Sequence, residues 1–152
     1  MAAFKLQTLL DVTQKRFDDA ERKLQQANAL LRAETEKLQL IINYRKEYEQ
    51  KLLAAQKSGL SVTQWRDFQV FIGKLDVAIE QQQQTIIRTQ AFVHSAQLQW
   101  EEQRKKLKGF ELLAEQHRQQ EVQKENRREQ KQSDEFSAKV YQSKRGDDPS
   151  KH

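Results

Sequence analysis

Residues 57–65 read Lys-Ser-Gly-Leu-Ser-Val-Thr-Gln-Trp, and they interrupt a chain that is otherwise patterned as helix. Gly59 can adopt the left-handed backbone conformation that closes a helix C-terminus, and Lys57 then stands in the last turn of that helix. Ser61, followed by Gln64 three residues later, matches the capping box that begins a helix. The stretch therefore predicts the end of one helix and the start of the next.

The connection between the two helices is short. Leu60 and Trp65 occupy the two positions that a hydrophobic staple brings together at the start of a helix. A single reversal through residues 58–61 makes the two helices antiparallel neighbours. The predicted fold is all-α, a two-helix antiparallel coiled-coil hairpin.

Apolar residues before the turn follow one heptad register without a skip. Three of its core positions, Thr13, Glu34 and Arg45, are not apolar. A seam kept on a period of about 3.5 residues indicates a left-handed supercoil against a partner helix. The a positions are Ala3, Leu10, Phe17, Leu24, Leu31, Leu38, Arg45 and Leu52, and the d positions are Leu6, Thr13, Ala20, Ala27, Glu34, Ile41, Tyr48 and Ala55.

A second register begins at Trp65, out of phase with the first, so the helix must be interrupted between Ala55 and Trp65. Its a row is apolar throughout, whereas its d row is weaker because it includes several polar residues. The a positions are Trp65, Ile72, Ile79, Ile86, Val93, Trp100, Leu107 and Ala114, and the d positions are Phe68, Leu75, Gln82, Thr89, Ala96, Gln103, Phe110 and His117.

Pairing about the turn makes the second helix longer than the first. With the turn centred near Gly59, residue i lies roughly opposite residue 118 − i, so Ala3 falls near Glu115. Beyond that point the register would place charged residues in the core. We expect an unpaired charged overhang from about Arg118, roughly 40 Å long at ~1.5 Å per residue. Because an isolated polar helix is marginal in water, the overhang is either a frayed tail or a segment ordered by another protein.

The predicted organisation is therefore a single hairpin over residues 1–143 followed by a short tail. Its parts are helix 1 at about 3–57, the turn at 58–61, helix 2 at about 62–142 with the overhang from about 118, and a disordered tail at 144–152.

The composition is that of long helices rather than of a compact core. Hydrophobic residues make up 36% of the 152 residues and charged residues 32%, and the single Pro stands at position 149. No run approaches the ~20 apolar residues that span a bilayer, and no secretory signal is evident, so we expect a cytoplasmic protein without membrane insertion. The net charge of +5 comes from 27 basic and 22 acidic residues that are interleaved, and a nucleic-acid partner is therefore not expected.

The sequence contains no pattern that supports catalysis, a cofactor or a metal. Its four Gly residues never cluster into a phosphate-binding loop, and it has no Cys. The three His residues, His94, His117 and His152, lie far apart and form no metal-ligand spacing. A two-helix coil also buries no pocket that would tune a carboxylate for acid–base work. We expect no enzyme activity and no cofactor.

Large apolar residues near the turn outnumber those that the seam can absorb. Phe71 directly precedes the seam residue Ile72 and cannot face the same way on a helix. This excess predicts a partner-binding patch, with a locally wider core or a dimer contact as the alternatives. The residues concerned are Tyr44, Leu53, Leu60, Val62, Val70, Phe71 and Val77.

Three stretches have a distinctive residue order: 42–48 (INYRKEY), 65–79 (WRDFQVFIGKLDVAI) and 125–136 (ENRREQKQSDEF). Together with the hairpin spacing, they resemble the FliJ family of the flagellar type III protein-export apparatus, nearer its enterobacterial members. The resemblance extends from about Leu6 to Tyr141. The third stretch is the most specific, because generic coiled coils have no reason to share its order of Asn, Asp and Phe.

The resemblance implies a soluble component of the export apparatus, located in the cytoplasm and peripherally associated with the inner membrane at the flagellar base. Proteins of this family are similar to the central stalk of rotary ATPases. They are implied to insert in the ring of the export ATPase FliI and promote its assembly, to contact the export gate FlhA, and to escort substrate chaperones such as FlgN and FliT. FliH is a further implied partner.

The resemblance also assigns surfaces. The family's gate-contact positions fall on Phe71 and Leu75, and Tyr44 and Trp65 complete the expected gate-binding tip. Leu75 is also a seam residue, so its two assignments compete. The overhang is assigned to the ATPase ring, with Arg118, Arg127, Arg128, Lys131 and Asp134 as the expected contact residues.

Two other functions account for the heptads. A generic structural or scaffolding coiled-coil adaptor explains the seam but not the three distinctive stretches. A stalk protein of a virulence-type secretion system would share the architecture, and only residue-level resemblance separates it from a flagellar protein.

Overall fold

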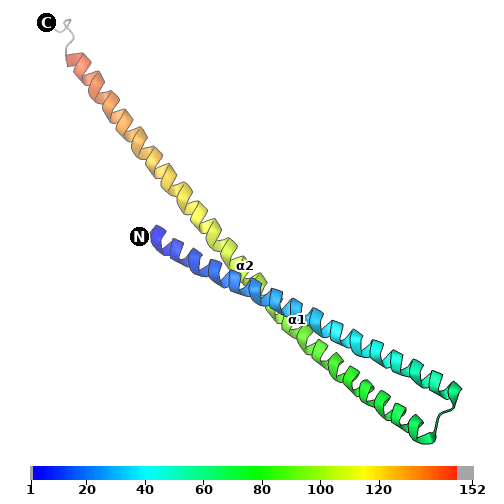
Figure 1. Cartoon of the computed structure of the whole chain (residues 1–152). Helices are drawn as coiled ribbons and strands as arrows, with labels where there is room; N and C mark the ends of the chain where they lie inside the picture. Colours follow the sequence, from blue (N-terminus) through cyan, green and yellow to red (C-terminus); the bar gives the residue numbers. More distant parts are fainter. Residues whose placement is uncertain (1, 147–152) are drawn as a thin grey trace. The chain divides into compact units, whose positions relative to one another are not determined.

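The computed structural model describes residues 2–146, and side chains from residue 3 onward. Its elements are two α-helices, α1 (Ala2–Ser58) and α2 (Val62–Gly146), joined by one turn (Figure 1). No strand occurs in this part of the chain. The two helices pack against each other and α2 is the longer, so the predicted all-α coiled-coil hairpin is confirmed.

The chain forms two compact units, which are described separately. The turn unit comprises Gln14–Lys105, and the terminal unit contains the residues before Gln14 and after Lys105. In neither helix does any stretch between residues 2 and 146 have the length and apolar character needed to cross a membrane.

The turn forms as its sequence predicts. Gly59 has a φ of 94°, a left-handed backbone conformation that favours Gly over residues with a Cβ. The capping box closes the start of α2, because the Ser61 amide donates to Gln64 Oε1 at 3.1 Å and the Gln64 amide donates to Ser61 Oγ at 3.1 Å. The Trp65 amide donates to the Ser61 carbonyl at 3.0 Å, which is the first helical hydrogen bond of α2.

The seam of the turn unit follows both heptad registers. Every predicted core position between residues 14 and 105 is buried or half-buried, apart from Trp65, whose residue is 46% exposed. The most buried apolar residues include small ones, Ala20, Ala27 and Ala96. Small side chains allow the backbones of two helices to approach, which leaves little room for water between them. Trp65, which lies beside the turn, departs from the pattern and lines a hollow with Gln56 of α1 and Leu60.

Two polar core positions of α1 find partners on α2. Arg45 Nε donates to Asp76 Oδ1 at 2.5 Å, and Arg45 also pairs with Glu49 on its own helix. The Gln82 amide donates to the Glu34 carbonyl at 2.9 Å and to the Glu34 carboxylate at 2.5 Å. A polar pair within a seam is satisfied in only one alignment of the helices, so these contacts specify the register.

In the terminal unit, the first turns of α1 pack on α2. Thr13 and Leu107 are buried, and Leu6, Leu10, Ala114 and His117 are half-buried. From Arg118 to Gly146 every residue is exposed. The helix continues through Lys144, Arg145 and Gly146, beyond the end expected near residue 142, since no Pro stands before position 149. The rest of the predicted tail, residues 147–152, lies outside the described residues.

We expect Gly59→Ala and Gly73→Ala to change stability in opposite directions. A Cβ at Gly59 is strained by the positive φ, so the free energy of unfolding should fall by about 1–2 kcal/mol. Gly73 lies inside α2, where an added Cβ would meet open space, so Ala should raise that free energy by about 0.5–1 kcal/mol. Urea denaturation followed by circular dichroism measures both. A stabilising Gly59→Ala would contradict the assigned turn.

Candidate functional site

The candidate site consists of two exposed surfaces. The tip surface lies in the turn unit and includes the predicted gate-binding residues Tyr44, Trp65, Phe71 and Leu75. The overhang, residues 118–146, lies in the terminal unit and includes the predicted ring-contact residues. Among residues 2–146 no group of His, Asp or Glu could hold a metal ion.

An aromatic cluster joins the two helices at the tip surface. The ring of Phe71 lies 4.3 Å from the ring of Tyr48 and 5.9 Å, edge-on, from the ring of Tyr44, measured between centroids. The ring of Tyr48 also contacts Phe68 at 5.5 Å. Aromatic pairs at these separations contribute about 0.5–1.5 kcal/mol beyond the area that they bury. Phe71 is therefore half-buried and stabilises the hairpin, while Tyr44 is 44% exposed.

Sequence reasoning placed Tyr44 and Phe71 outside the seam but did not predict that they meet. The signal was available, because each residue immediately precedes a seam residue on its own helix, and position 74, opposite Tyr44 about the turn, lies about one helical turn from Phe71. Leu75 is half-buried at its seam position. The structure thus brings Tyr44 and Phe71 into contact and places Leu75 in the seam.

Trp65 lies apart from the aromatic cluster, beside the turn. It lines a shallow hollow of ≈ 300 Å³ together with Leu60 and Val62. Val62 is 74% exposed, and three further apolar residues near the turn are also exposed: Leu53, Val70 and Val77. The tip surface therefore offers apolar side chains around a small depression, as an anchor residue of a partner would require.

The overhang has a chain of local polar contacts along its length. Lys124 pairs with Glu121 at 3.7 Å, Arg128 pairs with Glu125 at 3.8 Å, and each pair is three residues apart. Neighbours at this spacing stabilise a helix by about 0.2–0.5 kcal/mol each. These contacts support the helical conformation without any apolar partner.

The predicted ring-contact residues do not form one group. Arg127, Lys131 and Asp134 line one face of α2, around a shallow hollow that is completed by Gln130, Glu135 and Ala138. Arg128 is engaged with Glu125, and Arg118 donates to Glu115 at 2.7 Å and 3.1 Å. Arg127 and Lys131 have no ion-pair partner among the residues that the structure describes, so their charges are available to another molecule.

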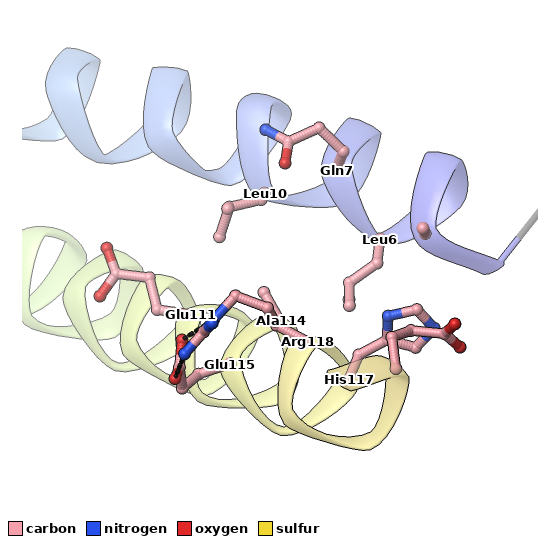
Figure 2. A pocket seen from close by; sticks show the side chains of 10 residues that line it. Leu6, Gln7, Leu10, Glu111, Ala114, Glu115, His117 and Arg118 are labelled. Carbon is pink, nitrogen blue, oxygen red and sulfur yellow. Dashed lines mark hydrogen bonds and ion pairs between the residues drawn. The ribbon is translucent and has the colours of Figure 1, made fainter. Parts of the chain in front are cut away.

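A further hollow lies where the first turns of α1 meet α2 in the terminal unit. Figure 2 shows Leu6 and Leu10 directed toward Ala114, with the Arg118–Glu115 ion pair at its edge. Its volume is ≈ 480 Å³. The sequence predicts that the apolar seam ends near Glu115. It does not predict the hollow, because the shape of the hollow depends on how far apart the two helices lie.

The family model described as Flagellar FliJ protein matches residues 1–146, which include the turn, both helices and the overhang. The chain belongs to the flagellar FliJ protein family. The Flagellar FliJ proteins of Salmonella typhi and of Escherichia coli (strain K12) are each 30% identical to it over 135 residues, which cover 89% of this chain and 92% of each relative.

A solved structure shares the fold. A chain from Chlamydia trachomatis described as a YscO homolog has a TM-score of 0.59 and 18% sequence identity, and the match covers 94% of this chain and 97% of that one. At this identity the likeness concerns the fold alone. The FliJ family match includes the overhang, residues 118–146.

The Arg118–Glu115 pair shifts the pKa of the Glu115 carboxyl. The hydrogen bond from the Arg118 guanidinium lowers the pKa of Glu115 from its ordinary value of 4.5, and the positive charge of Arg118 adds to this. Both effects favour the ionised carboxylate. The stabilisation from this pair is therefore present above the ordinary pKa of Glu115 and is lost as the pH falls through the lowered value.

We expect Arg118→Gln to raise the pKa of Glu115 toward its ordinary value, since the charged donor is removed. An NMR titration of the Glu115 side-chain carboxyl carbon measures this pKa directly. The matched control is Arg127→Gln, which removes the same charge elsewhere on α2 and should leave the titration unchanged. An equal effect of the two substitutions would mean that the local hydrogen bond is not the cause.

Proposed function

We propose that this chain is a non-enzymatic component of the flagellar type III export apparatus, in which it acts as the stalk of the export ATPase. In this role the overhang enters the ring of FliI and promotes its assembly, and the tip surface binds the export gate FlhA. The protein also escorts substrate chaperones such as FlgN and FliT, and FliH is a further partner. It acts in the cytoplasm, peripherally associated with the inner membrane at the flagellar base.

The observation that supports this proposal most is the FliJ family match over residues 1–146, which takes in a fully exposed helical overhang. Its large apolar residues, Val122, Phe136, Val140 and Tyr141, are all exposed. Its local ion pairs keep it helical while leaving Arg127 and Lys131 available. Such a segment suits insertion into a lumen lined by other subunits.

A stalk within a ring can act by contacting the surrounding subunits unequally. A contact that favours one nucleotide state at one subunit interface shifts the populations of states around the hexamer. Exposed ion pairs contribute only about 0–1 kcal/mol each, so charged contacts can be exchanged between neighbouring subunits at little cost. The interleaved charges of the overhang fit this requirement better than an apolar surface would.

The second candidate is a stalk protein of a virulence-type secretion system. It is favoured only by the fold shared with the chain described as a YscO homolog, at 18% identity. The flagellar relatives are 30% identical over most of the chain, and the flagellar assignment is therefore preferred.

We expect the full-length protein to stimulate ATP hydrolysis by FliI from the same organism, at an enzyme concentration where ring assembly limits the rate. Truncation after Glu121 removes most of the overhang and should abolish the stimulation. Combined reversal of Arg127, Lys131 and Asp134 should reduce it by more than half, because these side chains share one exposed face. The steady-state rate of phosphate release measures each effect.

The control for the charge reversals is a triple reversal in the turn unit, at the exposed residues Arg32, Lys46 and Glu80. It changes the same number and signs of charge and should leave the stimulation intact. Full stimulation by the truncated chain, with its helices retained by circular dichroism, would contradict the assignment of the overhang to the ATPase.

We expect Trp65→Ala and Phe71→Leu each to weaken binding to the cytoplasmic domain of FlhA by at least about tenfold, as truncation of an interface anchor does. Leu is chosen at position 71 because Ala would also remove most of the contacts with Tyr44 and Tyr48 that hold the helices together. Isothermal titration calorimetry measures the affinity. Ile87→Ala, at an exposed position of α2 away from the tip, is the control. Wild-type affinity in both tip variants would contradict the assignment of FlhA binding to the tip surface.

A further inference from the structure

One side of the turn unit differs in chemistry from the other. Lys23, Leu30 and Lys37 each immediately precede a seam residue of α1, so they form one row along the helix. The corresponding row of α2 includes Phe71 and Phe92. The contact between Tyr44 and Phe71, one from each row, indicates that the two rows flank the seam on the same side. No Asp or Glu occurs in either row within the turn unit.

We name this side the lateral face and define it by Lys23, Leu30, Lys37, Leu40, Arg88 and Phe92. Leu40 and Arg88 lie in the next row outward, which also contains the acidic residues Asp19, Glu47, Asp67 and Glu102. Its apolar members are exposed: Leu30 is 46%, Leu40 68% and Phe92 52% accessible to solvent. The basic members are exposed as well. Lys37 Nζ lies 3.8 Å from Glu34, but that carboxylate is mostly buried in the seam and accepts from Gln82. The lateral face therefore presents apolar and positive groups together.

The rows that flank the seam on the opposite side contain acidic residues. Glu21, Glu49 and Asp76 occupy the rows that flank the seam there, and Arg45 turns toward that side to pair with Glu49 and Asp76. The remaining positions of these rows are mostly uncharged. The two sides of one helix pair thus differ in charge, although the chain as a whole has interleaved charges.

The width of the apolar stripe on a helix indicates how many neighbouring helices it packs against. A two-stranded coiled coil buries only its a and d positions, whereas apolar residues in an adjoining row are typical of a helix that packs on two neighbours. Leu30 on α1 and Phe92 on α2 extend the stripe from both helices toward the same side. A third helix lying along the groove between α1 and α2 would cover both.

We propose that the lateral face binds an acidic amphipathic helix of another protein, packed along the groove between α1 and α2 in the turn unit. Its apolar residues contact Leu30, Leu40 and Phe92, and its Glu or Asp side chains pair with Lys23, Lys37 and Arg88. The absence of acidic residues from the two flanking rows favours an acidic partner, since complementary charge selects the partner and like charge rejects it. A second copy presenting the same face would bring positive charge against positive charge.

The test uses the full-length protein and two labelled helical peptides of about 21 residues, roughly six turns, at nanomolar concentration. The acidic peptide has one stripe of Leu with Glu in the flanking rows, and the basic peptide has Lys in place of every Glu. Fluorescence anisotropy measures binding. We expect the acidic peptide to bind at least about tenfold more tightly than the basic one, and to lose affinity as salt rises, because exposed charges are screened.

Variants locate the site. Leu30→Gln with Phe92→Gln should weaken binding of the acidic peptide at least about tenfold, since the apolar anchors are lost. Lys37→Glu with Arg88→Glu should weaken it to a similar extent. The matched controls lie off the lateral face: Ile87→Gln, an equally exposed apolar position, and Arg32→Glu with Lys46→Glu. Circular dichroism verifies that each variant retains its helices.

Three outcomes overturn the proposal. One is equal affinity for the acidic and basic peptides. Another is unchanged binding in both lateral-face variants. The third is a dimer, detected by analytical ultracentrifugation of the protein alone, that Leu30→Gln with Phe92→Gln dissociates, because it would assign the lateral face to a second copy of the chain.

Discussion

Two helices packed side by side can bury only the stripe along which they touch, and this limit explains most other features of the molecule. Ala27 is completely buried, yet no large side chain among the described residues is. Two buried polar groups in the seam are satisfied within their own helix. The hydroxyls of Thr13 and Thr89 donate to carbonyls one turn back on their own helices, at 2.7 Å and 2.8 Å. Many large apolar side chains are exposed, and they are therefore available to partners.

The fold was predictable because a few features of the sequence act between residues that are close together along the chain. Gly59, the Ser61–Gln64 capping box and the change of heptad phase act within a few residues, so the sequence alone places the turn and aligns the helices about it. Trp65 shows the limit of this reasoning. Its register position predicts burial, but the residue is 46% exposed and lines a shallow hollow beside the turn.

The interaction surfaces were less predictable, because they depend on the angle at which each side chain leaves its helix. Phe71 was expected at the surface, and the structure places it half-buried against Tyr44 and Tyr48. On the overhang, five residues were expected to contact the ATPase ring, which stays a prediction; two of them, Arg118 and Arg128, pair with acidic neighbours on their own helix. Spacing alone does not reveal which of several possible local pairs forms.

The antiparallel arrangement also has a consequence for the order in which the chain folds. Contacts across the seam join residues that are farther apart in sequence the farther they lie from Gly59: Arg45 and Asp76 are 31 residues apart, and Glu34 and Gln82 are 48 apart. Since the entropy lost on closing a loop grows with its length, pairing begins beside the turn and proceeds outward. The first turns of α1 are synthesised before the rest of the hairpin and are thus the last to gain their partners.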